Sequence, residues 1–109
     1  MRRGDIVVVS APGEYGKPRP VVVVQTDLLN EAHTSVAVCL MTTDVIAAPL
    51  FRLTVEPSEG NGLRKRSQIM VDKIVALRRE RLGQVAGTLD DETMLRLNRT
   101  LAFVLGLGD

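Results

Sequence analysis

The sequence predicts a mostly β chain with α: a small antiparallel β-barrel with an amphipathic helix at its C-terminal end. Three observations carry this prediction. Short apolar, β-branched runs recur at close intervals, turn-forming residues separate them, and the apolar spacing changes to a helical period near the end of the chain. A length of 109 residues and a hydrophobic content of 45% match a single core, so we expect one domain over residues 1–109.

Five apolar runs are expected to form the strands. Residues that end strands or tolerate unusual backbone angles lie between them, for example Thr26-Asp27 and the segment 56–62. In the fourth run apolar and polar residues partly alternate, so this strand is expected to have one wetter face. The five runs are Ile6–Val9, Val21–Gln25, Ser35–Thr42, Leu50–Val55 and Gln68–Leu77.

The C-terminal stretch has the pattern of an amphipathic helix. Its apolar residues fall three and four positions apart, and polar residues fill the other faces. Asp90 is the expected N-cap, and Gly106 and Gly108 mark the end. The apolar content is generous for one helix face on a small barrel, and it fits either core packing or a homodimer interface. The periodic residues are Met94, Leu97, Leu101 and Val104.

Charge is distributed unevenly along the chain. The net charge is +1, which argues against a general binder of polyanions. Residues 1–60 carry five Lys or Arg against seven Asp or Glu, residues 61–81 carry seven against two, and residues 82–109 carry two against four. A local basic segment of this kind is typical of a surface that contacts RNA.

Cysteine and histidine content limits the chemistry. The single cysteine, Cys39, cannot form an internal disulfide and lies among apolar residues, so we expect a buried thiol. His33, in a polar connection, is expected in solvent. One cysteine and one histidine make no ligand cluster for zinc, and we expect neither a metal nor another cofactor. The sequence shows no signal-like or membrane-length apolar run, which predicts a cytoplasmic protein without membrane contact.

Arg19 stands between two prolines and ahead of four consecutive valines. Pro18 has a locked φ, and Pro20 keeps Arg19 out of the helical region, so the guanidinium is mounted on a restricted backbone. The valine run suits a strand that is buried on both faces. A planar fork of donors that stays charged is suited to binding phosphate. A solvated arginine at a strand edge is the simpler alternative.

Several spaced motifs place Arg19 in a wider pattern. Gly4-Asp5-Ile6-Val7-Val8-Val9 precedes it, Thr42 follows a second apolar strand, and residues 83–89 read Gly-Gln-Val-Ala-Gly-Thr-Leu. This ordered set resembles the MazF/PemK family of toxin endoribonucleases over nearly the whole chain. The resemblance implies an SH3-like barrel that forms a homodimer and cleaves single-stranded RNA as the toxin of a type II toxin–antitoxin pair. It also implies an antitoxin whose disordered acidic tail lies over the basic site, and contact with DNA only through the antitoxin complex.

RNA can be cut without a metal if its 2′-hydroxyl attacks the adjacent phosphorus. The reaction needs a base, charge stabilisation of the phosphorane and an acid for the leaving oxygen. Arg19 is the candidate for charge stabilisation and for proton donation. Glu14 precedes it by five residues, and the family often has an acidic residue or a histidine in this loop, so the resemblance implies that Glu14 is the base. A loop acid paired with Lys17 or Arg19 is the alternative.

Thr42, Tyr15 and Lys17 complete the expected cleavage site. A hydroxyl at a strand end can bind phosphate or orient the 2′-hydroxyl, and the family has a threonine at the end of this strand; Thr43 is the adjacent alternative. A threonine that only caps the strand is the generic interpretation. The assignment of the base stays open between Glu14 and Thr42. Tyr15 can stack on a base or pack within its own loop, and Lys17 is expected to contact the substrate.

A basic turn extends the expected substrate surface. Arg64, Lys65 and Arg66 precede a strand and are expected to contact the RNA backbone, although such a run is usually a solvated turn. The segment resembles the family's Gly-Leu-Lys-Lys-Asp-Ser stretch, with Arg66 in place of the acid. The turn is therefore more basic than the common pattern.

Asp72 and Lys73 are the last expected substrate contacts. Asp72 aligns with an acid that the PemK branch uses near its active site. The arginine that accompanies this acid two residues earlier is absent, because Met70 stands there, and an arginine downstream is replaced within Val75-Ala76-Leu77. These departures predict an altered preference for RNA sequence.

Two other functions stay open at this point. Gyrase-poisoning CcdB toxins resemble the same fold, but gyrase binding depends on the helix terminus and gives no role to Arg19, Glu14 and Thr42. A noncatalytic RNA-binding barrel is compatible with the arginines missing around Asp72. The set of Arg19, Glu14 and Thr42 favours RNA cleavage.

Overall fold

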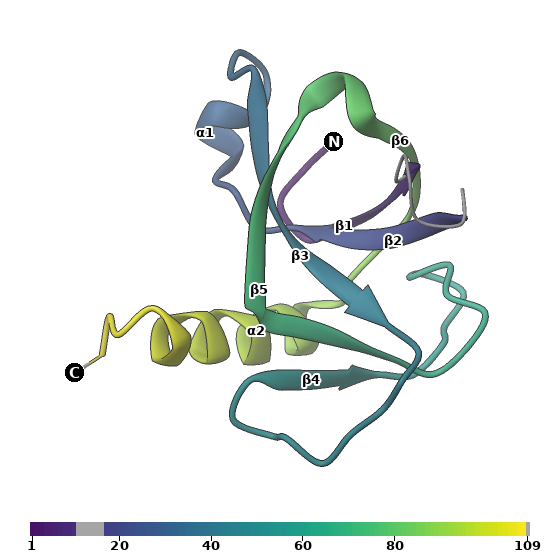
Figure 1. Cartoon of the computed structure of the whole chain (residues 1–109), viewed down its shortest axis with the longest axis vertical. Coiled ribbons are helices and arrows are strands. Elements are labelled where there is room, and N and C mark those ends of the chain that lie inside the picture. The colour runs from purple at the N-terminus through teal and green to yellow at the C-terminus, as the bar shows by residue number, and fades with distance from the viewer. Residues whose placement is uncertain (11–16, 109) are drawn as a thin grey trace.

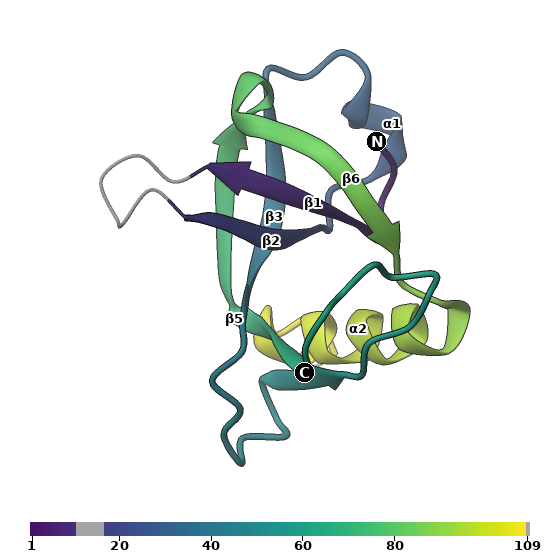
Figure 2. The ribbon, with the colours of Figure 1, turned by 90° about the vertical axis from the view of Figure 1, so that its right-hand side faces the viewer.

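The computed structural model describes residues 1–10 and 17–108, which form a six-stranded antiparallel sheet and a long C-terminal helix. The strand order is β4-β5-β3-β2-β1-β6. The sheet is strongly curled, with β1, β2 and β6 arching over one end and α2 packed beside β4 and β5 at the other (Figures 1 and 2). The expected class, mostly β with a C-terminal helix, is confirmed. The elements are β1 (Asp5–Ser10), β2 (Pro18–Val23), α1 (Asp27–Asn30), β3 (Ser35–Thr42), β4 (Arg52–Val55), β5 (Ser67–Arg78), η1 (Arg79–Arg81), β6 (Leu82–Thr88) and α2 (Asp91–Val104).

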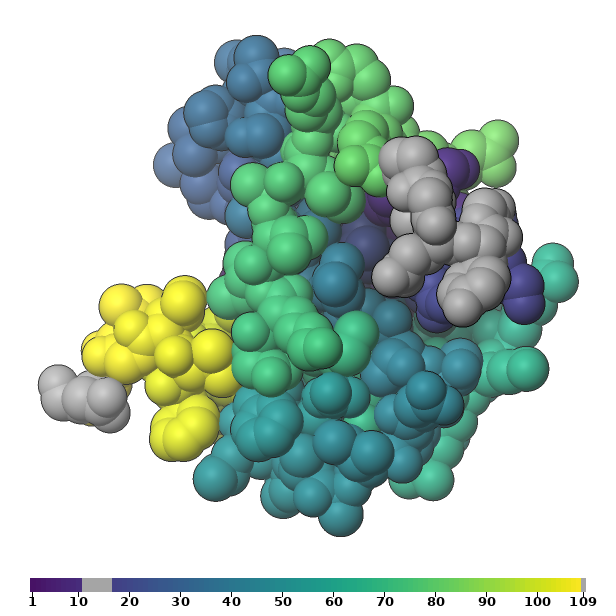
Figure 3. Space-filling view, in the orientation of Figure 1, coloured from purple at the N-terminus to yellow at the C-terminus, as the bar shows by residue number. Residues whose placement is uncertain are grey.

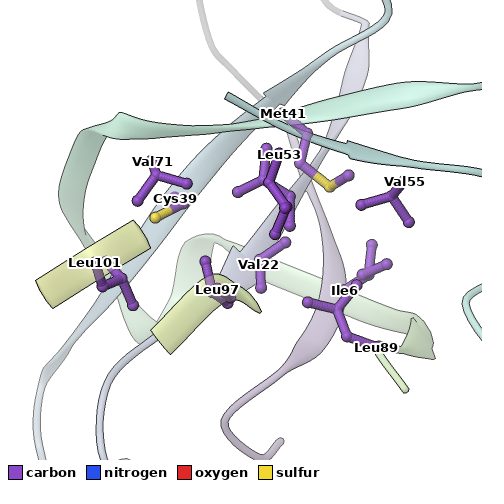
Figure 4. Packing of buried hydrophobic residues seen from close by; sticks show 11 residues of the cluster. Ile6, Val22, Cys39, Met41, Leu53, Val55, Val71, Leu89, Leu97 and Leu101 are labelled. Carbon is purple, nitrogen blue, oxygen red and sulfur yellow. The ribbon is translucent and has the colours of Figure 1, made fainter. Parts of the chain in front are cut away.

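The four-valine run sends its side chains into two separate parts of the core. Val21 and Val23 join a valine cluster, whereas Val22 and Val24 contact a helix-side core that packs under α2. Successive side chains of a strand point to opposite faces, so a strand covered on both faces is apolar throughout. The valine cluster contains Val7, Val9, Val21, Val23, Val36 and Val38. The helix-side core contains Ile6, Val22, Cys39, Met41, Leu53, Val55, Ile69, Val71, Leu89, Leu97 and Leu101 (Figure 4).

Strand β5 bends at a bulge near its middle. Leu40 of β3 pairs with Met70, but the preceding residue, Cys39, pairs with Ile74, so residues 71–73 of β5 have no counterpart on β3. An insertion of this kind bends a strand and redirects its side chains. The first part of β5 pairs with both β3 and β4, and the second part continues along β3 alone. The bulge contains Asp72.

Strand β6 and helix α1 are absent from the sequence prediction. Most of β6 is exposed, and the strand contains Gly83 and Gly87, so it has no apolar run and no alternation to reveal it. It forms because β1 offers it an edge, with Val7 opposite Val85. Helix α1 is a single turn, too short to show a helical period, and Asn30 buries its amide against the carbonyl of Gln25.

Gly62 has a conformation that only glycine adopts readily at this point. Its φ is +69°, and a Cβ at this position would lie 2.2 Å from the backbone carbonyl oxygen of Ala86 in β6. Gly62→Ala is therefore expected to lower the free energy of unfolding by about 2 kcal/mol or more, measured by urea denaturation. Gly60→Ala is the matched control, because the nearest atom to its added methyl group would be 4.0 Å away. Equal stability of the two variants would contradict this account of the turn.

Helix α2 begins and ends where the sequence predicts. The Asp90 side chain accepts a hydrogen bond of 2.7 Å from the backbone N–H of Thr93, which satisfies one of the free donors of the first turn. The chain turns away after the helix at Gly106, whose φ is +71°. Hydrogen bonding with Thr93, first with its side chain and then with its backbone N–H, holds the pKa of the Asp90 carboxyl below its ordinary value.

The lowered pKa of Asp90 predicts a pH-dependent contribution to stability. Because the folded state binds the proton less tightly, the contribution is complete above the pKa of the unfolded carboxyl, about 3.9, and disappears as the pH falls through the folded pKa. Asp90→Ala should lower the thermal midpoint at pH 7, and the difference from wild type should vanish at acidic pH. Asp90→Asn, which caps without titrating, should keep its midpoint difference from Asp90→Ala across this range.

Only some of the apolar side chains of α2 are buried in the core. Leu97 and Leu101 are buried, but Leu95 and Phe103 are about half exposed, at 51% and 55%. Leu107, just beyond the helix, is 75% exposed. Core packing therefore accounts for only part of the apolar content, and the homodimer interface remains a prediction. No helix in the described ranges is long and apolar enough to cross a bilayer.

Candidate active site

Arg19 is an exposed residue near the start of β2. The strand begins at Pro18, three residues before the expected start, and Arg19 pairs with Val9 of β1. The pairing of β2 with β3 begins only at Val21. The two prolines, which have no N–H to donate, thus lie where β2 has only one neighbouring strand. The guanidinium projects from a short, stiff extension of the sheet.

Thr42 is the last residue of β3. Val21 and Leu40 are the last pair of β2 with β3 among the described residues, and Arg19 and Thr42 each lie two residues beyond it. Because alternate residues of a strand point to the same face, Arg19 shares a face with Val21, and Thr42 shares a face with Val38. Both predicted residues therefore lie on the side of the sheet that carries the valine cluster, at the end where β2 and β3 are no longer paired.

The Thr42 hydroxyl accepts one hydrogen bond within the protein, and its own hydrogen can still be donated in a second one. Its Oγ1 accepts a 3.0 Å hydrogen bond from the backbone N–H of Asp44, so the strand-capping interpretation is correct as far as it goes. A hydroxyl oxygen that accepts one bond can still donate. Thr42 is half-buried, whereas Thr43 is exposed. Of the two threonines, Thr42 has the more restricted position.

Gln68 orders the loop that follows Thr42, a role that the sequence analysis missed. It is the β5 partner of both Thr42 and Thr54, and only 3% of it is exposed. Its amide exchanges two hydrogen bonds with the backbone of Ile46, at 2.9 and 3.1 Å, and donates a third to the Thr54 hydroxyl. A glutamine at the start of an apolar strand is the signal that could have drawn attention to it.

Asp72 has an arginine beside it, but from a different strand than the family pattern predicts. The Arg52 Nε of β4 lies 4.0 Å from the Asp72 Oδ1, and Arg52 is the pairing partner of Met70. The Arg52 side chain is only 13% exposed, and its Nε is buried without a hydrogen-bond partner among the described residues. Lys73, next along the bulge, is exposed. After Gln68, Arg52 is the second residue of the candidate active site that the sequence did not predict.

The basic turn approaches β2 from the other face. Arg64, Lys65 and Arg66 are exposed in the loop before β5, and Arg66 Nε lies 2.9 Å from Glu56 Oε2 in a solvent-exposed pair. Such pairs contribute little to stability. Arg64 lines a groove of about 470 Å³ together with Pro18 and Pro20, whose side chains alternate with that of Arg19. Arg64 thus lies beside the Arg19 segment.

Three of the predicted contacts involve the segment before β2. Glu14 and Tyr15 lie outside the described residues. Lys17, the first described residue after them, is exposed.

Away from this region, Cys39 is fully buried, and desolvation raises its thiol pKa to about 11, so it stays protonated at neutral pH. His33 is exposed, as expected.

Comparisons with known proteins agree on one family. Residues 2–105 match the PemK-like, MazF-like toxins of type II toxin–antitoxin systems. The chain is 42% identical over 108 residues to the probable endoribonuclease MazF of Mycolicibacterium smegmatis, covering 98% of each protein. It is 31% identical over 112 residues to the endoribonuclease MazF of Staphylococcus saprophyticus, covering 98% of this chain and 92% of that protein.

A solved structure shows the same fold. It is an endoribonuclease from a mycobacterial species in complex with its cognate antitoxin, and it matches with a TM-score of 0.83 and 25% identity. The match covers 98% of this chain and 96% of that one. The chain therefore belongs to the PemK-like, MazF-like toxin family of type II toxin–antitoxin systems, and it is an endoribonuclease.

Proposed function

We propose that this toxin cleaves single-stranded RNA at a short sequence, without a metal ion, by transesterification. The 2′-hydroxyl loses its proton to a base and its oxygen bonds to the adjacent phosphorus, while the bond from phosphorus to the 5′ oxygen breaks. That oxygen takes a proton and leaves as a 5′-hydroxyl, and the other end carries a 2′,3′-cyclic phosphate. The observation that supports this proposal most is that Arg19 and Thr42 lie on the same side of the sheet, each two residues beyond the last pair of β2 with β3.

Arg19 and Thr42 have complementary roles in the proposed step. The guanidinium neutralises the charge that develops on the phosphorane oxygens, and an N–H of the same group is the proton donor to the leaving oxygen. Thr42 binds the phosphate or orients the 2′-hydroxyl through its remaining hydrogen-bonding capacity. Glu14 is the proposed general base, five residues before Arg19, and Thr42 is the alternative for that role.

Substrate binding draws on the basic turn, on the bulge of β5 and on the segment before β2. Arg64, Lys65 and Arg66 supply backbone contacts, as exposed cations do. Asp72 and Lys73 are exposed on the bulge and are proposed to contact the RNA near the cleaved bond. In the segment before β2, Tyr15 is proposed to stack on a base and Lys17 to contact the strand.

Partners follow from the family. The mycobacterial relative was solved with its cognate antitoxin, and we propose that an antitoxin with a disordered acidic tail covers the basic site of this chain as well. The exposed apolar residues of α2 support a homodimer. We further propose that the protein acts in the cytoplasm, and that it meets DNA only through the antitoxin complex.

The metal-independent mechanism is tested by cleavage in EDTA. In the described ranges, no group of three or more His, Cys, Asp or Glu side chains is arranged to hold a metal ion. Purified protein should cut a long transcript at the same rate with and without EDTA, and leave 2′,3′-cyclic phosphate or 3′-phosphate ends beside 5′-hydroxyl ends. Restoration of cutting only by an added divalent cation, or 5′-phosphate ends, would contradict the mechanism.

A further inference from the structure

A groove of about 390 Å³ runs along the outer edge of β4. One wall is the segment 46–49, which belongs to the loop that starts at Thr42, and the other wall is the polar side of α2. Figure 1 shows β4 with this loop on one side and α2 on the other, and in Figure 3 the loop lies on the same face as β3 and β5. Gln68, the β5 partner of Thr42, also lines the groove, so the groove reaches the strand beside Thr42.

The groove is positively charged. Its described lining includes Arg52 from β4 and Arg96 and Arg99 from α2, and no carboxylate. Arg96 and Arg99 are three residues apart and so share one side of the helix. Both are exposed, and neither forms an ion pair with a described residue. Three guanidinium groups in one concavity repel each other, and an anion placed among them relieves that repulsion.

Arg52 adds an independent sign of a missing partner. Its Nε is buried without a hydrogen bond among the described residues, and its nearest carboxylate oxygen, on Asp72, is 4.0 Å away. Buried polar groups in folded proteins are nearly always satisfied, so the described residues pair the Arg52 guanidinium only incompletely. Phosphate, which accepts several charge-assisted bonds from arginine, has the matching chemistry.

We propose that this groove binds the backbone of the RNA substrate beyond the cleaved bond, with Arg52, Arg96 and Arg99 contacting its phosphates. Neighbouring strands are about 4.8 Å apart, so Thr54, two strands away from Thr42 through Gln68, lies about 10 Å from it. The groove thus contacts a nucleotide other than the one that is cut. This inference rests on the proposed RNA cleavage and extends it to a second binding region.

The test compares RNAs of two lengths. The cleavage site is first mapped on a long transcript, and the protein is then assayed on a minimal RNA around that site and on RNAs extended by several nucleotides at the 5′ or 3′ side. For Arg96→Gln/Arg99→Gln we expect KM on one extended RNA to rise about fivefold or more, with kcat and the minimal RNA unchanged. The control is Arg2→Gln/Arg78→Gln, which removes two exposed arginines away from the groove.

Binding measurements separate this inference from the proposed cleavage. Fluorescence anisotropy with an extended 2′-O-methyl RNA, which cannot be cut, measures the binding constant at several salt concentrations. The slope of the logarithm of this constant against the logarithm of the salt concentration should be less steep by about 1.4 in the double variant. Each lost phosphate contact in a single strand accounts for about 0.7 of this change. An unchanged slope and an unchanged length dependence would overturn the groove proposal, even if wild type cleaves RNA. If wild type does not cleave, the slope still tests the groove.

Two further measurements address the alternatives. Arg52→Gln should lower affinity for the extended RNA, and Arg52→Lys should restore it only in part, because lysine keeps the charge but not the fork. Thermal unfolding of both variants identifies any loss that arises from misfolding. A polyglutamate peptide provides the test of a different occupant: if the double variant loses peptide binding and keeps RNA binding, the groove is a site for acidic protein segments, and the RNA proposal fails.

Discussion

Arg19→Ala is expected to reduce kcat for RNA cleavage by about 10²- to 10³-fold, the usual cost of removing one preorganised donor to a developing anion. The effect should fall on catalysis and not on folding. Arg19 is exposed, and its strand is held by Val21 to Val23, which lie in the core. The free energy of unfolding should therefore change by less than about 0.5 kcal/mol. Single-turnover cleavage of a mapped RNA substrate, together with urea denaturation, measures both quantities.

Two control variants define what Arg19 does. Arg19→Lys keeps the positive charge and loses the planar fork, so a cleavage rate between those of wild type and Arg19→Ala is expected. Arg2→Ala removes another exposed arginine, outside the candidate site, and should cut at the wild-type rate. Wild-type cleavage by Arg19→Ala would remove Arg19 from the catalytic step. Equal rates for Arg19→Lys and wild type would show that charge alone is sufficient.

Leu97→Ala is expected to produce the largest loss of stability from a single change, about 2–5 kcal/mol. Leu97 is fully buried and is a main contact of α2 with the sheet, where Figure 4 shows it beside Val22 in the helix-side core. Removing its side chain leaves a cavity between the helix and the sheet that rigid neighbouring strands fill only in part. The shift of the urea midpoint at constant m-value measures this loss.

Leu95→Ala is the matched control for the core prediction. Leu95 is on the same helix and of the same size, but it is half exposed, so its truncation in a monomer should change the free energy of unfolding by less than about 0.5 kcal/mol. The stability of a homodimer depends on protein concentration. A large effect of Leu95→Ala that grows with concentration would place this face of α2 in the dimer interface. A small effect of Leu97→Ala would contradict the packing described above.

Sequence patterns predicted the elements whose signals are local. The valine run of β2, the alternation in β4 and the three-and-four spacing of α2 each reflect which side chains one element buries. The same patterns did not predict β6, because an exposed edge strand with two glycines buries too little to leave a period. They also began β2 at Val21 rather than at Pro18, since prolines argue against a strand except where one neighbour is missing.

The sequence by itself determined the family, the helix with its Asp90 cap, and the rigid mounting of Arg19 between two prolines. Only the tertiary structure put Thr42 on the same side of the sheet as Arg19, placed Gln68 against the loop after Thr42, and placed Arg52 beside Asp72. The physical reason is that pairing register and bulges decide which side chains meet, and these depend on contacts between residues that are distant in the chain. Met70 is therefore not evidence that Asp72 lacks an arginine, because Arg52 of β4, which lies twenty residues before Asp72 and pairs with Met70, supplies one.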